Sequence, residues 1–145
     1  MKIAEGMTPA EKSFTFLALL VASLPGEQDY TADASRWATA VLHLRKRYGP
    51  KYPHLFRYIH FRHAPRADSY SPEVSNFLAF LQFADGVTVQ NPGFTKMRFQ
   101  PTALNILRDR YKDLATGDDR LAIEEMSRDI SGRIEANPEA STRSA

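Results

Sequence analysis

Apolar residues recur at helical spacing in six segments of this chain. The six segments cover residues 8–24, 32–48, 53–63, 71–84, 101–115 and 118–136. Cap and breaker residues support the boundaries, because Thr8-Pro9 is typical of a helix start and Gly49-Pro50 of a helix end. The apolar face of the first segment is unusually broad, because Phe16 and Leu19 extend it, so we expect it to be the central helix.

The period changes from helical to alternating after residue 86. Residues 87–90 predict one strand, and residues 95–99, where Met97 and Phe99 alternate with polar residues, predict a returning strand. Residues 28–30 look like a loop, and residues 137–145 are small and polar, which predicts a disordered tail. The pattern therefore indicates a mainly α fold, with a single domain over residues 1–136 made of about six helices and one β-hairpin.

Composition fits a soluble domain with its own core, since 43% of the 145 residues are hydrophobic and 25% are charged. The chain has no cysteine, which excludes disulfides and thiolate metal sites. Its longest apolar run, residues 14–24, is shorter than the roughly 20 residues that a membrane helix needs. We expect a cytoplasmic protein that does not associate with a membrane.

Charge is distributed very unevenly along the chain. No acidic residue lies between Asp33 and Asp68, and this acid-free stretch holds eight Lys or Arg, six aromatic residues and all four histidines. Because the whole chain has a formal charge of +2, the remainder sums to −6. Residues 113–139 carry eight acids against three arginines. Such asymmetry bears on the choice of partner more than the total charge does.

The basic and aromatic composition of the stretch predicts a nucleic-acid surface, in which cations neutralise phosphates and aromatic rings stack on bases. We expect two cations of the second strand to assist. The predicted nucleic-acid-binding residues are Arg45, Lys46, Arg47, Lys51, Arg57, Arg62, Arg66, Lys96 and Arg98. The alternative is structural: several of the aromatic residues fit helix stripes that face the core, and the cations then only solvate the opposite face.

Residues 70–115 resemble a winged-helix domain. Helix 71–84, hairpin 87–99 and helix 101–115 follow the order recognition helix, wing, closing helix, carried by "FLAFLQFADGVTV" and "MRFQPTALNILRDRY". The resemblance implies DNA binding and transcription regulation. This chain departs from the pattern in two ways. Pro101-Thr102-Ala103 replaces the Leu-Thr-x-x-Gly segment common in such families, and helix 71–84 has Glu73 as its only charge. A helix without cations and rich in Phe suits a protein interface better than a DNA groove.

A second resemblance lies in the acid-free stretch. The segment "YGPKYPHLFRYI" is similar to the Tyr-Gly-Pro-x-x-Pro-x-Leu-Tyr segment of Panacea-type antitoxin and proteolytic-adaptor domains. The matching positions are Tyr48, Gly49, Pro50, Pro53, Leu55 and Phe56. This resemblance implies a small helical protein that binds a toxin or protease partner.

His60 and His63 are three residues apart and could share one face of helix 53–63 as metal ligands. A catalytic zinc site uses about three protein ligands, and no neighbouring acid completes a familiar spacing. Arg57 and Arg62 would also repel a cation, so surface histidines are the alternative. Because no enzyme motif is present, we expect no catalytic residues and no cofactor.

The acids of residues 113–139 are candidate partners for the basic stretch, either within the same chain or across a dimer. The alternative is a solvated helix that makes few contacts. The weak apolar stripe of residues 121–134 favours docking on a second copy of the chain and hence a homodimer. Two pairs of acids, Asp118-Asp119 and Glu124-Glu125, lie at the predicted helix start and on an expected solvated face, and compensation of the helix dipole explains the first pair without catalytic chemistry.

The function hypotheses follow in order. The first is a non-enzymatic regulatory protein that binds nucleic acid through the basic surface. The second is a protein-interaction module of antitoxin or adaptor type. The third is a small metal-dependent or ligand-binding protein that uses His60, His63 and an acid not evident from the sequence.

Overall fold

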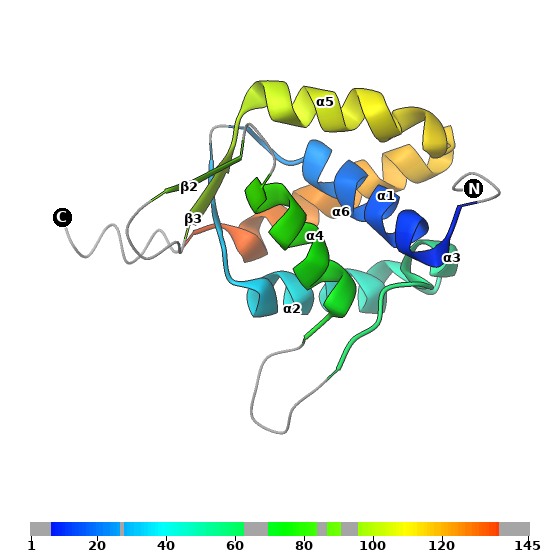
Figure 1. Ribbon diagram of the computed structural model, residues 1–145. Helices are drawn as coiled ribbons and strands as arrows, with labels where there is room; N and C mark the ends of the chain where they lie inside the picture. The colour runs from blue at the N-terminus through cyan, green and yellow to red at the C-terminus, as the bar shows by residue number, and fades with distance from the viewer. Residues whose placement is uncertain (1–6, 27, 63–69, 84–86, 91–95, 137–145) are drawn as a thin grey trace.

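The structure is a computed structural model that describes residues 7–26, 28–62, 70–83, 87–90 and 96–136 (Figure 1). The structural statements below concern these ranges. They hold six α-helices around one core, a small sheet at one end of the molecule and a 3₁₀ turn, η1 (Lys112–Leu114). This confirms the expected mainly α fold. The expected disordered tail, residues 137–145, lies outside the described residues.

Helix α1 (Pro9–Ala22) is the central element of the core. Its start is fixed by a capping box, in which the Thr8 hydroxyl accepts from the backbone N–H of Glu11 and the Glu11 carboxylate accepts from that of Thr8. Every residue from 15 to 22 is buried, because α1 packs against α3 to α6. The expectation of a central helix is confirmed.

Helix α6 (Gly117–Ile134) covers one side of α1 and also packs on α2 (Ala34–Tyr48). Its apolar stripe, which includes Ile123, Met126 and Ile130, is buried within the chain. The interpretation of this stripe as a surface for a second copy was wrong, although Leu121 on its edge is exposed. A stripe alone cannot distinguish an intramolecular partner from an intermolecular one.

The sheet has three strands in the order β1-β3-β2, all antiparallel to their neighbours. Strands β2 (Val87–Gln90) and β3 (Lys96–Phe99) form the expected hairpin. The prediction of a loop over residues 28–30 was wrong, because Asp29–Thr31 forms β1 and pairs with β3. Three residues are too few to show an alternation, and the partner strand lies more than 60 residues away in sequence.

Helix α3 (Pro53–Phe56) is one turn long, so the prediction of a helix to residue 63 was wrong at its C-terminal end. Phe56 and Ile59 are both buried, and the helical spacing that suggested a longer helix comes from a turn followed by irregular chain. The chain then reaches an isolated β-bridge between Arg62 and Tyr70. His60 therefore does not lie on a helix.

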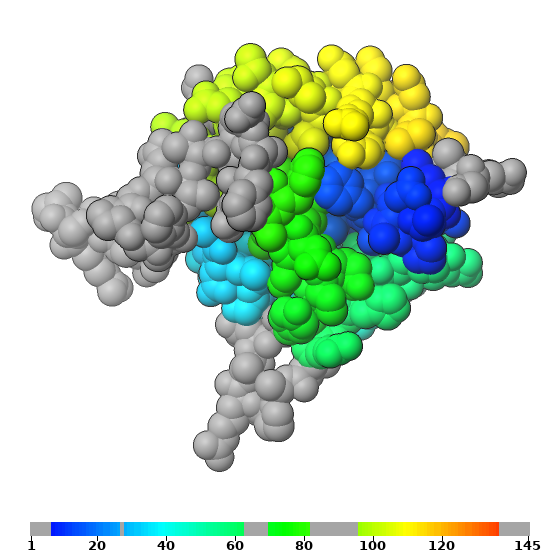
Figure 2. Space-filling model, in the orientation of Figure 1, coloured from blue at the N-terminus to red at the C-terminus, as the bar shows by residue number. Residues whose placement is uncertain are grey.

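The remaining boundaries agree with the sequence pattern to within a few residues. Helix α4 (Pro72–Phe83) crosses the core from the side opposite α6, and α5 (Pro101–Tyr111) lies along α1. Figure 2 shows α4 running down one face of the molecule between the N-terminal half of α2 and α1.

Candidate nucleic-acid interface

The site lies where α2 ends and α3 begins. Arg45, Lys46 and Arg47 occupy the last turn of α2, where cations are favoured by the helix dipole. The turn continues into Gly49, whose N–H donates to the Arg45 carbonyl oxygen. A Cβ at position 49 would collide with this carbonyl, so glycine lets the chain leave the helix tightly.

Acids from other elements form ion pairs with part of the acid-free stretch. Asp129 of α6 contacts Arg47 at 2.9 Å and lies 3.5 Å from His43 Nε2. Asp119, also of α6, contacts His54 Nε2 at 3.0 Å. This confirms that the acidic segment contains partners for the basic stretch within the chain. Asp119, at the start of α6, is only 2% exposed, whereas Glu124 and Glu125 are exposed as expected.

Among the described residues, five exposed cations of the stretch have no ion pair with an acid, and the half-buried Arg36, which has none either, donates to the backbone carbonyl oxygens of Arg133 and Glu135. We call the five exposed cations the basic surface, and they are Arg45, Lys46, Lys51, Arg57 and Arg62. They lie on the last turn of α2, around α3 and on the segment that follows α3, so contiguous parts of the fold carry them at one end of α2.

Aromatic rings hold several cations in place of acids. The Arg45 guanidinium lies 4.7 Å from the ring centre of Phe61, and the Lys51 ammonium lies 5.5 Å from that of Tyr52. A cation–π contact uses the face of the ring and leaves the N–H donors of the cation available. A carboxylate would instead neutralise the charge and occupy those donors. The rings therefore position these cations without neutralising them.

An open groove of about 510 Å³ lies within the basic surface. Arg45, Arg57 and His60 contribute exposed side chains to it, and Phe56 and Ile59, both buried, form its floor together with the half-buried Phe61. We call it the aromatic groove. It combines cationic side chains with an apolar floor, an arrangement suited to a ligand that has both a phosphate and a flat apolar part.

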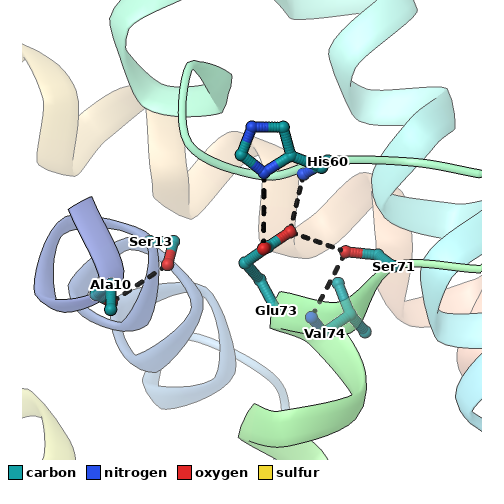
Figure 3. Close-up of polar contacts among 6 residues, drawn as sticks. All are labelled: Ala10, Ser13, His60, Ser71, Glu73 and Val74. Carbon is teal, nitrogen blue, oxygen red and sulfur yellow. Dashed lines mark hydrogen bonds and ion pairs between the residues drawn. The ribbon is translucent and has the colours of Figure 1, made fainter.

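Figure 3 shows how His60 is oriented. Its backbone N–H donates to Glu73 Oε1 at 2.7 Å, and its Nδ1 lies 3.3 Å from Glu73 Oε2. The Ser71 hydroxyl also contacts the Glu73 carboxylate and caps the start of α4 at the backbone N–H of Val74. Glu73 thus ties residue 60 to α4, and the Nε2 atom of His60 points away from the carboxylate.

The remaining predicted site residues do not join the basic surface. Arg47 faces α6 and pairs with Asp129. Arg98 pairs with Asp29 of β1 at 2.8 Å, and Lys96 lies on the same strand at the opposite end of the molecule from α3. Arg66 lies outside the described residues.

The metal hypothesis gains no support. His63 lies outside the described residues, and no group of three or more His, Asp or Glu suited to a metal ion occurs among the residues that the structure describes. His60 has an acidic partner, Glu73, that sequence spacing did not reveal because α4 begins more than ten residues later.

One further cation at this end was missed from the sequence. The Lys12 ammonium of α1 lies 5.3 Å from the ring centre of Tyr58, and the start of α1 and the α3 region lie side by side (Figure 2). In the sequence Lys12 follows Glu11 directly, so the two charges cancel and the segment does not stand out as basic.

Tyr48 lies at the border between the basic surface and α6. Burial raises the pKa of its hydroxyl, and the carboxylates of Asp129 and Glu125 add to this effect while Arg47 opposes it. Tyr48 therefore stays a neutral phenol at physiological pH, and the negative charge here belongs to α6.

Comparison with protein-family models, curated proteins and solved structures finds no match to this chain. Within the described ranges, none of the helices has the length and apolar character needed to cross a membrane.

Proposed function

We propose that this protein is a non-enzymatic regulatory protein that binds nucleic acid through the basic surface. The observation that carries the proposal is the selective pairing of charges. The acids of α4 and α6 pair with one arginine and three histidines of the acid-free stretch, whereas five exposed cations have no such partner in the described residues. Concentrating unpaired like charges at one end destabilises a fold unless a polyanion binds there.

The mechanism is phosphate neutralisation. Each Lys or Arg that contacts a phosphate releases counterions, so affinity falls steeply with salt. The aromatic rings under Arg45 and Lys51 limit the conformations of these side chains and reduce the entropy lost on binding.

The order α4, hairpin β2–β3, α5 supports a likeness to winged-helix domains, and β1 extends the hairpin to three strands. In that likeness α4 would be the recognition helix. Its sequence carries no Lys or Arg, and the described outer residues Asn76, Ala79 and Phe80 are uncharged. The proposed binding surface is therefore at the α2–α3 corner and not on α4.

The test is a triple substitution, Arg45→Ala, Lys46→Ala and Arg57→Ala, assayed with mixed DNA and RNA at low salt. We expect binding to weaken on all sequences and the slope of log affinity against log salt to fall by about two to three. The matched control, Arg110→Ala, Arg120→Ala and Arg128→Ala, removes three exposed arginines from α5 and α6 and should bind almost normally. Failure of the wild-type protein to bind any nucleic acid would overturn the proposal.

A second candidate is a protein-interaction module of antitoxin or adaptor type. It is favoured by Phe80 on α4, which is 45% exposed although its ring packs edge-on against Phe14. Residues 48–59, which resemble a segment of Panacea-type domains, include the α2–α3 corner. Co-purification of one stoichiometric partner that survives nuclease treatment and is lost in Phe80→Asp would favour this function.

A further inference from the structure

We infer that the partner is a single-stranded nucleic acid, with a base held in the aromatic groove and the backbone running past His60. The inference rests on the proposed function and specifies the class of nucleic acid. It depends on the shape of the surface, on the contact between Arg45 and Phe61, and on a second hollow that shares His60.

The groove has an apolar floor, of which the half-buried Phe61 is the part that a ligand can reach. Phe56, Ile59 and Phe61 lie beneath the charged side chains of Arg45 and Arg57. In a duplex the bases are stacked inside, so only phosphates and sugars could reach a groove of this kind and its apolar floor would stay unused. A single strand can turn a base outward and place it against an apolar or aromatic surface.

Arg45 supplies a flat surface on which a base can stack. Its guanidinium lies 4.7 Å from the ring centre of Phe61, the residue is exposed, and no acid pairs with it among the described residues. A guanidinium plane held in this way can stack on a base while its edge donates to a phosphate. Arg57, across the same groove, offers a second phosphate contact.

A second hollow of about 280 Å³ extends the track beyond His60. It is lined by Tyr58, Phe14 and Phe77 as well as His60, and Lys12 lies over the Tyr58 ring. Two hollows that share one residue, each with an aromatic side chain and a nearby cation, match successive nucleotides of a strand.

His60 is a positioning residue at the boundary of the two hollows. Glu73 holds its Nδ1 side, so the exposed Nε2 is directed away from α4 (Figure 3). It can hydrogen-bond to a phosphate or a base edge. The charged groups that face it are Glu73 from α4 and Arg45 and Arg57 in the groove.

The side-chain composition of α4 argues against recognition of a duplex. A helix that enters a major groove lies between two rows of phosphates and uses Arg, Lys, Asn or Gln. Helix α4 has an exposed Asn76 but no Lys or Arg for the phosphates, and its only charge, the carboxylate of Glu73, is engaged with His60.

Fluorescence anisotropy can test the inference with three probes: a labelled single strand, its duplex, and a strand of equal length built from abasic units. We expect the single strand to bind about tenfold more tightly than either of the others, because only it offers bases to the groove. Equal affinity for all three would show that the surface binds phosphates alone. That result would overturn the inference and leave the proposed function standing, whereas no binding of any probe would overturn the proposed function itself.

Two variants locate the base contact. Phe61→Leu keeps the charge and the apolar floor but removes the ring under Arg45, and Arg45→Lys keeps the charge but removes the guanidinium plane. Each should lower affinity for the single strand about fivefold and change affinity for the abasic strand little. Phe80→Leu is the matched control, an exposed aromatic on α4 outside the groove, and should bind normally. Normal binding of the single strand by Arg45→Lys, an exposed substitution that should not affect folding, would contradict the inference.

Discussion

The two sides of the last turn of α2 carry the same kind of side chain in opposite circumstances. Arg47 faces α6 and meets the carboxylate of Asp129, whereas Arg45 faces the segment after α3 and meets the ring of Phe61. On the α6 side the charge joins two helices and is neutralised. On the α3 side it is held in place and remains available. The role of a cation here depends on what the neighbouring element offers, and two positions along one helix turn are enough to change it.

The largest effect should come from the pair that connects the two sides. His54, beside the groove, contacts Asp119, which is almost fully buried at the start of α6. His54→Ala would leave that carboxylate without its partner, and we expect a loss of about 2 kcal/mol in the free energy of unfolding. Denaturant unfolding would measure it, and His54→Gln, which can still donate, is the control. Unchanged stability in the alanine variant would contradict a structural role for this contact.

Reversing charge on each side should separate the two roles of arginine. Arg45→Glu should weaken nucleic-acid binding about tenfold and leave stability nearly unchanged. Arg47→Glu should reduce binding less and lower the melting temperature more, because it places a carboxylate against Asp129. The two variants have equal net charge, so each is the control for the other. Identical effects on binding would mean that the two sides do not differ in function.

Removing the charge of Asp129 should leave Arg47 as available to nucleic acid as Arg45. Asp129→Asn keeps the side-chain shape but releases Arg47, and we expect affinity for nucleic acid to rise about threefold at low salt. Some stability should be lost, since Asp129 also lies near His43 and Arg133. Anisotropy titration and thermal melting measure the two effects. A drop in affinity would show that Arg47 already contributes through its present geometry.

The smallest effect concerns the other end of α2. Asp33 caps this helix, and hydrogen bonds, first from the Ser35 hydroxyl and then from backbone N–H groups, lower its pKa. A carboxylate whose pKa is lower in the folded state stabilises the protein above its unfolded pKa, and this contribution is lost as pH falls through the folded value. Asp33→Asn keeps the cap, so it should cost at most about 0.5 kcal/mol near neutral pH, because the group is exposed and screened. Its stability should also fall less than that of the wild type below about pH 4. The measurement is the free energy of unfolding of both proteins as a function of pH. A difference between the two that stays constant down to low pH would contradict this role of Asp33.

Local signals predicted most of the fold. The capping box at Thr8, the breaker at Gly49 and the alternation at Met97 and Phe99 act over a few residues, so the sequence pattern located α1, the end of α2 and β3. The pattern failed where long-range contacts decide. Strand β1 exists because residues 29–31 pair with a distant strand, and Ile59 is buried although α3 ends at Phe56, so apolar spacing there did not mean a helix.

The candidate site divides in the same way. The sequence by itself determined that cations and aromatic rings are concentrated between residues 34 and 67, and that α4 lacks cations. Only the tertiary structure decided which cations are neutralised, because Asp119, Asp129 and Glu73 lie on helices outside the stretch and reach it through the fold. It also decided that Phe61 lies beside Arg45 and that Lys12 joins the same end. Charge content is a local property of the chain, whereas charge pairing depends on distances of a few ångströms that folding alone sets.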